Sequence, residues 1–536
     1  MNRLSSFFTT PWPYLLIISI GISLKFYHLN HRIFWLDEVS TVLYTSGQDE
    51  KELVNKTRNQ IINIKYYDSL LRPLSMKRSI TSEVKRIFSN THLTPAHYVF
   101  LVIWYRLVGD STTDFRLFSV FIYLLCLPFL FLLIKKLSGD NLYAWITTSL
   151  FSVAPFISFH AQEARYYILW VFLFILSNYV FLLTISKNKM IWWIAYSIIS
   201  IVALYTTLLS GLIIFGHLLY VLYFHKEMRS RFFISAMLIA LAYSPWLYFL
   251  YTVRSEISDG LSWQINQNSS FYTLKYLFYQ FLGWSRSFNY LADSTHYIFL
   301  FWGIIPISSN ELYPALIIDI LILSLIFYAI KYFFAKSQAS TRWLLVFLML
   351  PTFLLFYGSD SVRSGFISAM WRYHVVNMVG IIIVVAYFLK DKIAKGNLKY
   401  IGFYITLAVV SIASIIKFQQ SRTWFLPGET ITHNSQAIDK TFYPLVITDL
   451  NGDNRYGFPS FLSMLKEVKS KNADILYFDG SADILKQTDT RRYSKILVLF
   501  ASEKLIQKFK ADYGERMSVF SEKTDGASSS VWQIKR

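Results

Sequence analysis

Two adjacent acids, Asp37 and Glu38, stand out among the residues of this chain that could do chemistry. They follow the first long apolar run closely, in the stretch Arg32-Ile-Phe-Trp-Leu-Asp37-Glu38, beside a tryptophan suited to a membrane interface. Ionised carboxylates at that depth are costly unless they are solvated or paired. By themselves, these residues leave two interpretations equally open: an ordinary wet loop, or the base of an active site.

Another acid lies in the stretch Gln162-Glu163-Ala-Arg165-Tyr-Tyr, between two later apolar runs. In isolation, Glu163 and Arg165 are typical of an ion pair at a helix boundary. Two further arginines, Arg116 and Arg372, also begin apolar runs. The topology derived below puts all of these residues on the outer side of a membrane, and this convergence favours a functional site. Arginines at a membrane rim suit a phosphate, because the guanidinium fork matches its oxygens.

The composition indicates a membrane protein. Of 536 residues, 54% are hydrophobic and 18% aromatic, and the mean hydropathy is +0.38. A net charge of +19 would suggest nucleic acid in a soluble protein, but here the basic residues cluster in short turns between apolar runs. We therefore expect membrane lipids and no nucleic acid as partners. The single cysteine, Cys126, excludes an intramolecular disulfide and a cysteine-rich metal site.

Apolar runs long enough to cross a bilayer predict a polytopic helical protein of about eleven transmembrane helices. The run after Met1-Asn2-Arg3 lacks a small-residue cleavage site, so we expect a retained first span and no cleaved signal peptide. A further apolar stretch from Tyr98 to Val108 is too short to cross, and we expect it to lie in the interface. The predicted spans lie at about 12–28, 115–134, 141–159, 166–185, 191–208, 209–224, 232–252, 312–333, 343–358, 373–389 and 400–417.

The positive-inside rule orients these spans with the N-terminus in the cytoplasm. If the Tyr98 segment crossed as well, the later basic turns would fall outside, which the rule disfavours. The inner turns are rich in lysine and arginine and poor in acids: they hold Lys135 and Lys136; Lys187 and Lys189; Lys226, Arg229 and Arg231; Lys331, Lys336 and Arg342; and Lys390, Lys392, Lys395 and Lys399.

This orientation leaves three large pieces outside: loops at about 29–114 and 253–311, and the tail from about 418. We therefore expect a transmembrane domain over residues 1–417 and a small α/β domain over 418–536 on the outer face. In the tail, strand-like runs alternate with charged helical stretches. The stretch Asp449-Leu-Asn-Gly-Asp453 favours a turn over a calcium loop, because the remaining ligand spacing is missing. The predicted strands are 444–447, 473–478, 495–500 and 531–534, and the predicted helices are 460–469 and 504–513.

Several of these motifs together resemble a known family. Thr94-Pro95-Ala-His97-Tyr98, Trp104-Tyr-Arg-Leu-Val-Gly109-Asp110-Ser111, Phe115-Arg116-Leu-Phe-Ser119 and the Gln162–Tyr167 stretch are similar to the N-terminal half of GT-C glycosyltransferases. More narrowly, they resemble the glycosyltransferase family 39-like branch of protein O-mannosyltransferases, lipid A aminoarabinose transferases and lipopolysaccharide-core glycosyltransferases. The resemblance covers about residues 10–220, and beyond it only Arg372-Tyr373 stands out.

The resemblance implies transfer of a sugar from a polyprenyl-phosphate donor to a glycan, lipid or protein acceptor. It places this chemistry on the non-cytoplasmic face of a bacterial inner membrane, with the C-terminal domain periplasmic or extracellular. The family's acid in the first outer loop falls on Asp37, with Glu38 beside it. Its later acidic site falls on Glu163, with Arg165 alongside, and its arginine at the second span falls on Arg116.

One stretch departs from the family pattern. Many relatives have His-Pro-Pro or Lys-Pro-Pro before the interfacial helix, whereas this chain reads His92-Leu-Thr-Pro95-Ala-His97. His92 and His97 are therefore the candidates for the substrate contact made there. The departure also leaves open the metal site that some relatives build between loops, so no cofactor is assigned. Asp37 and Glu163 are the residues that would hold a divalent metal ion.

The expected mechanism uses Asp37 as the base that activates an acceptor hydroxyl. Arg116, Arg165 and Arg372 would stabilise the charge that develops on the departing lipid phosphate, with Tyr373 beside them in the substrate site. Glu38 or Glu163 would orient the acceptor or bind a divalent cation. A single displacement predicts inversion at the anomeric carbon.

Three other classes of protein remain as alternatives. A flippase or transporter for a lipid-linked sugar needs ionisable groups within its spans, and the clearest here is His217, which on its own is more often a satisfied helix contact. A glycan ligase would use a lipid-diphosphate donor. A structural scaffold would tolerate substitution of Asp37 and Glu163.

Overall fold

The chain folds as two compact units, each built from several stretches of sequence. Unit 1 comprises Met1–Leu29, His92–His97 and Arg116–Gln419, and unit 2 comprises Asn30–Thr91, Tyr98–Phe115 and Gln420–Arg536. The computed structural model describes residues 3–90, 94–261, 281, 283–289, 309–363, 367–422, 427–449, 457–478, 489–522 and 530–535.

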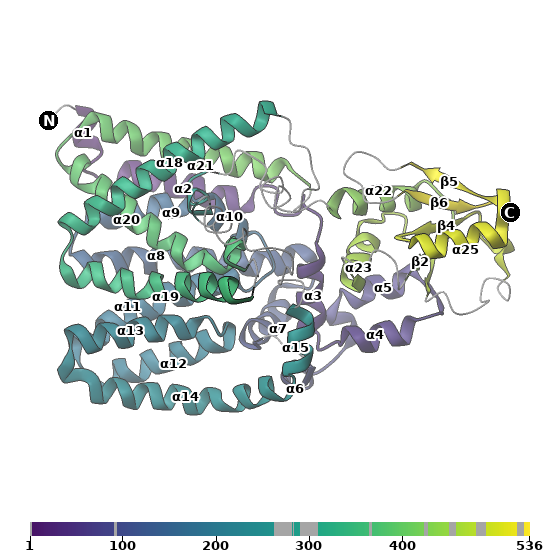
Figure 1. Ribbon diagram of the computed structural model, residues 1–536, viewed down its shortest axis with the longest axis horizontal. Helices are drawn as coiled ribbons and strands as arrows, with labels where there is room; N and C mark the ends of the chain where they lie inside the picture. Colours follow the sequence, from purple (N-terminus) through teal and green to yellow (C-terminus); the bar gives the residue numbers. More distant parts are fainter. Residues whose placement is uncertain are drawn as a thin grey trace. The chain divides into compact units, whose positions relative to one another are not determined.

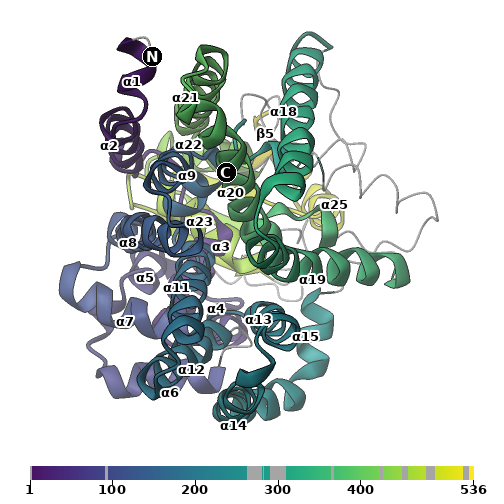
Figure 2. The ribbon, with the colours of Figure 1, turned by 90° about the vertical axis from the view of Figure 1, so that its left-hand side faces the viewer.

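Unit 1 is a bundle of apolar helices that lie lengthwise beside one another (Figure 1). Figure 2 shows the same bundle nearly end-on, with α9, α11 and α20 inside it. The helices are α1 (Arg3–Phe7), α2 (Trp12–Phe26), α8 (Thr112–Ser138), α9 (Asn141–Ser152), α10 (Pro155–Ala161), α11 (Tyr167–Lys187), α12 (Met190–Thr206), α13 (Ser210–Phe224), α14 (Arg229–Thr252), α15 (Arg254–Leu261), α18 (Ser309–Lys336), α19 (Ala339–Arg363), α20 (Val375–Ala394) and α21 (Leu398–Gln420).

Every predicted span coincides with a helix of this bundle. Within the described residues, seven helices are long and apolar enough to cross a membrane, and the bent pair α9 and α10 would make an eighth. The predicted spans at α2, α12 and α13 form shorter apolar helices of 15, 17 and 15 residues. The chain is thus a multi-pass membrane protein, and the count of eleven stays a prediction.

The packing of α2 against α9 is close and partly polar. A Cβ atom at Gly21 would lie only 2.6 Å from the main-chain oxygen of Ser152, so only glycine permits this approach. The buried ammonium of Lys25 donates to the same Ser152 oxygen at 3.2 Å and to that of Gly21 at 3.1 Å. These contacts fix the C-terminal end of α2, where Gln162 is also attached.

Unit 2 contains a six-stranded sheet in the order β1-β3-β2-β4-β6-β5. The central strands β3, β2 and β4 run parallel, whereas β1, β6 and β5 join antiparallel. The strands are β1 (Ile61–Asn63), β2 (Leu445–Asp449), β3 (Asp474–Phe478), β4 (Ile496–Leu499), β5 (Met517–Ser521) and β6 (Val531–Ile534). Its helices are α3 (Leu36–Thr45), α4 (Glu50–Thr57), α5 (Ile64–Leu70), α6 (Ile80–Asn90), α7 (Ala96–Val108), α22 (Pro427–Asp439), α23 (Gly457–Glu467) and α25 (Glu503–Tyr513).

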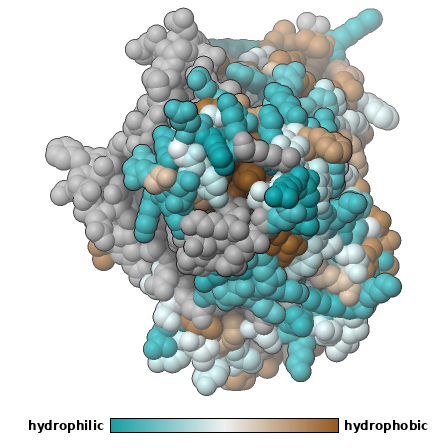
Figure 3. Space-filling model, turned by 90° about the vertical axis from the view of Figure 1, so that its right-hand side faces the viewer, coloured by the Kyte–Doolittle hydropathy of each residue, from teal (hydrophilic) through white to brown (hydrophobic). Residues whose placement is uncertain are grey.

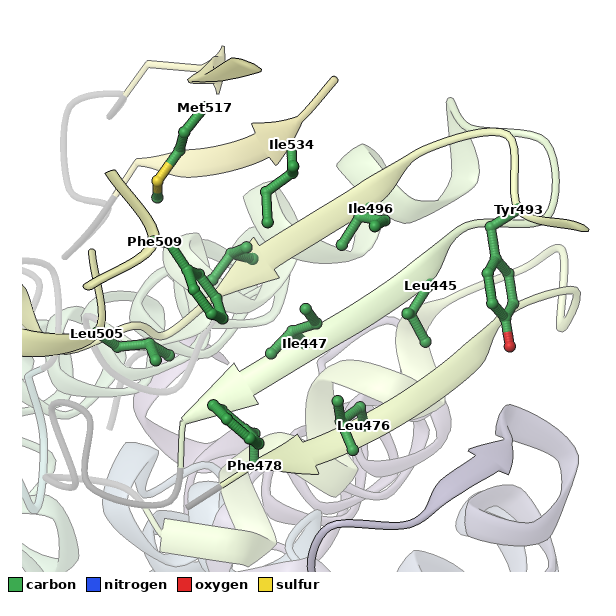
Figure 4. Close-up of a cluster of buried hydrophobic side chains, with 11 residues drawn as sticks. Leu445, Ile447, Leu476, Phe478, Tyr493, Ile496, Leu505, Phe509, Met517 and Ile534 are labelled. Carbon is green, nitrogen blue, oxygen red and sulfur yellow. The ribbon is translucent and has the colours of Figure 1, made fainter. Parts of the chain in front are cut away.

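The apolar core of unit 2 lies between one face of this sheet and α25 (Figure 4). Alternate residues of the central strands point into it, as the period of two in a strand requires. On the face of the molecule seen in Figure 3, most of the coloured residues are hydrophilic. The core consists of Leu445, Ile447, Leu476, Phe478, Tyr493, Ile496, Val498, Leu505, Phe509, Met517 and Ile534.

All four strands predicted in the tail coincide with β2, β3, β4 and β6, and both predicted helices coincide with α23 and α25. The structure adds β5 and an edge strand, β1, which comes from the segment predicted as the first outer loop. The predicted interfacial segment forms α7, a helix of 13 residues. Its placement in the membrane interface stays a prediction.

Candidate active site

Asp37 and Glu38 lie in the first turn of α3 and have different surroundings. The Glu38 side chain is 0% exposed, and its Oε2 accepts a hydrogen bond from the Trp35 main-chain N–H at 3.4 Å. Such a bond satisfies one of the N–H groups that a helix start leaves open. Asp37 is half-buried and reaches the surface. Of the two acids, Asp37 is therefore the more accessible.

Glu163 lies at a sharp corner of the chain in unit 1. Helix α9 ends at Ser152, α10 continues at an angle of 62°, and the chain then leaves the helix at Gln162. The Glu163 side chain is 1% exposed, and its Oε2 lies 2.9 Å from His160 Nδ1. Because a carboxylate only accepts, Nδ1 is the donor in this pair. His160 thus fixes the orientation of the Glu163 carboxylate.

Two glutamines hold this corner against the C-terminal end of α2. Gln162 Nε2 lies 3.1 Å from each of the main-chain oxygens of Leu24, Lys25 and Tyr27. Gln419 Nε2 donates in turn to Gln162 Oε1 at 3.0 Å. The first and last predicted spans are therefore joined directly beside Glu163.

Arg165 and Arg372 gather around the same corner. Arg165 lies over the rings of Tyr166 and Tyr167, at 5.7 and 5.9 Å from their centroids, and Arg372 lies 5.5 Å from the Tyr373 centroid. The charges of Arg372 and Arg165 both act on His160. Burial raises the pKa of Tyr166, as do Tyr167 and Tyr373, while Arg165 and Arg372 oppose the increase. Arg165, Arg372 and Tyr373 are thus neighbours of Tyr166 and the Glu163 corner.

His97 belongs to this cluster as an uncharged group. Burial, assisted by the charge of Arg165, lowers the pKa of His97 to about 3. Its ring packs against Phe118 at 5.7 Å between centroids. His97 can therefore contact a ligand as a neutral imidazole, without adding positive charge. His92 lies outside the described residues.

Arg116 is buried on α8, where Nη1 donates to the main-chain oxygen of Leu29 at 2.9 Å. One turn further along, the Ser119 hydroxyl donates to the main-chain oxygen of Glu163 at 2.6 Å. This part of α8 therefore contacts both the end of the first span and the Glu163 corner. The structure brings together Glu163, Arg165, Arg372, Tyr373 and His97 in unit 1, and it places Asp37 and Glu38 in unit 2.

A buried ion pair near Arg372 was not predicted from the sequence. Arg286 and Asp319 are both 0% exposed, with Nη2 and Oδ2 2.9 Å apart. The hydroxyl of Ser285 and the amide of Asn289 donate to Asp319 Oδ1 at 2.7 and 2.8 Å. The guanidinium lies 5.2 Å from the ring centroid of Trp371, the residue before Arg372. An acid inside a predicted span, at Asp319, was the sequence signal that could have found this network.

Asp360 holds the backbone just before the segment that carries Arg372. Its two carboxylate oxygens accept from the main-chain N–H groups of Ile367 and Ser368 at 2.9 and 2.6 Å. Asp360 thus fixes the backbone just before Trp371, and Asp319 fixes Arg286, which lies against the Trp371 ring. Among the residues that the structure describes, no three His, Cys, Asp or Glu side chains gather as a metal site.

His217, the candidate group for a transport path, is a packed helix contact. Its Nε2 lies 3.1 Å from Asn178 Oδ1, and its Nδ1 lies 3.1 Å from the Tyr196 hydroxyl. Its ring stacks on Phe181 at 4.0 Å between centroids. Both nitrogens therefore have protein partners, as the sequence interpretation expected.

The comparisons with known proteins found similar solved structures, whereas no family model and no curated protein matches. ArnT from Cupriavidus metallidurans bound to undecaprenyl phosphate is 14% identical, with a TM-score of 0.44, over 97% of this chain and 97% of its own. Its apo state is also 14% identical, with a TM-score of 0.37, over 93% and 97%. An Archaeoglobus fulgidus oligosaccharyltransferase tethered with an acceptor peptide is 12% identical, with a TM-score of 0.41, over 88% and 64%.

Proposed function

We propose that this protein is a membrane glycosyltransferase of the GT-C type that transfers a sugar from a polyprenyl-phosphate donor to a glycan, lipid or protein acceptor. The observation that carries the proposal is the cluster around Glu163. There, Arg165 and Arg372 lie near the Glu163 carboxylate, which is held by His160. Two guanidinium groups close together suit an anion. Because the cluster adjoins apolar helices, an anion with a hydrocarbon chain fits it best.

In the proposed reaction, the acceptor hydroxyl attacks the anomeric carbon of the donor and gives its proton to Asp37. The bond between that carbon and the phosphate oxygen breaks, and polyprenyl phosphate leaves with one more negative charge. Arg165 and Arg372 stabilise that charge as it develops. One displacement inverts the configuration at the anomeric carbon. Glu163 orients the acceptor, and Arg116 holds the ends of the first two spans together.

The proposal is tested with the protein in vesicles, supplied with lipid extract and membranes from producing cells. We expect polyprenyl phosphate to be released together with an acceptor heavier by one sugar, both measured by mass spectrometry. Arg165→Lys or Arg372→Lys keeps the charge but loses the planar fork, so we expect transfer to fall about 10- to 100-fold.

Arg254→Lys is the matched control, because Arg254 is an exposed arginine that stacks on Tyr251 at 4.3 Å. Equal losses in all three variants would show that the cluster has no special part in transfer. NMR of the product reports the anomeric configuration, and retention would contradict the single displacement.

We further propose that unit 2 lies on the non-cytoplasmic side, and that the N-terminus is cytoplasmic. The lysine- and arginine-rich turns of the sequence support this orientation. Alkaline phosphatase fused after residue 536 is expected to be active, because that enzyme needs an oxidising compartment. The same fusion at the turn after Lys187 is expected to be inactive. The reverse result would require the opposite orientation.

A further inference from the structure

The first outer loop and the tail interlock at the edge of the sheet in unit 2. Strand β1 of the loop pairs antiparallel with β3 of the tail, with Ile62 opposite Ile475. At the end of this pairing, Asn63 Nδ2 donates to Asp474 Oδ1 at 3.0 Å. Although more than 400 residues separate them in sequence, these segments belong to one sheet.

The helix that follows β1 is also attached to the tail. Helix α5 packs against α23, where the Tyr67 ring meets Phe461 edge-on at 5.5 Å between centroids. Asp68 of α5 forms ion pairs with two lysines of the tail, Lys466 at 3.5 Å and Lys471 at 3.1 Å. Apolar and charged contacts together therefore hold the middle of the loop on the tail.

Two residues just before α3 form hydrogen bonds with the tail, one through its main-chain oxygen and the other through its main-chain N–H. The wholly buried Ser463 hydroxyl of α23 donates to the main-chain oxygen of Phe34 at 2.6 Å. The N–H of Ile33 donates to the main-chain oxygen of Arg422 at 3.0 Å. Helix α3 itself packs along α23. Asp37 follows Phe34 by three residues, so the tail fixes the backbone from which Asp37 projects.

We infer that the tail positions the base of the reaction, and that Ser463 is a positioning residue that acts through Asp37. This inference rests on the proposed role of Asp37. Without the hydroxyl, the Phe34 oxygen loses this buried hydrogen bond. The first turn of α3 can then shift, and a displacement of about 1 Å is enough to cost about 10²-fold in rate. Through Ser463, α23 thus holds the first turn of α3 in place.

The first experiment compares two serines of α23. Ser463→Ala removes the bond to Phe34, whereas Ser460→Ala, one turn away, removes a buried hydroxyl that has no hydrogen-bond partner among the described residues. We expect Ser463→Ala to lower kcat about 10-fold or more, with the KM for the lipid donor and the affinity for undecaprenyl phosphate unchanged. Ser460→Ala is expected to stay close to the parent. Equal kcat values in the two variants would overturn the inference.

A double-mutant cycle separates positioning from general damage to the fold. If Ser463 acts through Asp37, then Ser463→Ala has no further effect on the residual transfer of Asp37→Asn. An additive loss would show another route of action and would overturn the inference. Hydrogen exchange provides a second readout, since we expect faster exchange at residues 35–40 and unchanged exchange in β3. If Ser463→Ala does not fold, Ser463→Cys, which is a weaker donor of similar size, replaces it in both measurements.

The same data distinguish failure of this inference from failure of the proposed function. Full transfer activity in Asp37→Asn would show that Asp37 is not the base, whatever the effect of Ser463→Ala. A different result would overturn only the support by the tail. In that case, Asp37→Asn loses transfer, which agrees with its role as the base, but Ser463→Ala and Ser460→Ala have equal kcat values.

Discussion

Asp37→Asn is expected to lower kcat by about 10²–10⁴-fold, which is the range that a positioned general base contributes. The amide cannot take the acceptor proton, yet it keeps the size of the carboxylate and its place in the first turn of α3. The affinity for the lipid donor is expected to stay unchanged, because the proposed phosphate contacts come from arginines. Transfer and undecaprenyl phosphate binding, measured in the same vesicles, test both parts.

The neighbouring acid gives the matched comparison. Glu38 is buried and accepts the Trp35 N–H, so its inferred role is to cap α3. Glu38→Gln keeps an oxygen that can accept this bond, and we expect transfer to fall only a few-fold, with a lower Tm. Glu52→Gln, at an exposed acid of α4, is expected to change neither quantity. If Glu38→Gln lost transfer as completely as Asp37→Asn, the roles of the two acids would have to be exchanged.

The sequence predicted the helices of unit 1 and most strands of the tail because both are local patterns. A run of apolar residues specifies a membrane helix, and a short β-branched run bounded by turns specifies a strand. The bend between α9 and α10 was not visible in the predicted span 141–159, although Pro155 at the start of α10 fits a break there.

Contacts between distant segments could not be predicted in the same way. Strand β1 is only three residues long, and nothing in its sequence shows that its partner lies in the tail. Arg286 lay in the predicted loop 253–311 and Asp319 in the predicted span 312–333, so neither pattern indicated a pair. In both cases the missing information was the tertiary arrangement, which a single sequence does not carry.

These long-range contacts support the charged residues of the proposed site in a similar way. Each charged residue of the mechanism lies next to buried groups that fix its backbone. Asp37 follows residues that are tied to the tail, and Arg372 follows Trp371, which lies over the Arg286 guanidinium. Preorganised charges stabilise a transition state without reorganisation during the reaction. The buried supports should therefore be as sensitive to substitution as the reacting groups.

The Arg286–Asp319 pair tests this expectation most severely. Asp319→Asn would leave a fully buried guanidinium without its countercharge, a change that typically costs about 3–5 kcal/mol. We expect a large decrease in the Tm of the purified protein. In the fraction that stays folded, weaker transfer is expected as well, because Trp371 and Arg372 lose their support. Thermal unfolding and transfer per folded molecule are the measurements.

Asp140→Asn is the control for loss of a charge alone. Asp140 pairs with Lys390 at 3.1 Å in a partly exposed position, where such a pair contributes about 0–1 kcal/mol, and asparagine can still cap α9 at the Tyr143 N–H. Asp319→Asn combined with Arg286→Gln removes both buried charges and is expected to recover part of the stability. It should not recover transfer, since the guanidinium under Trp371 is gone. Equal Tm shifts in Asp319→Asn and Asp140→Asn would mean that the buried pair contributes no more to stability than a surface one.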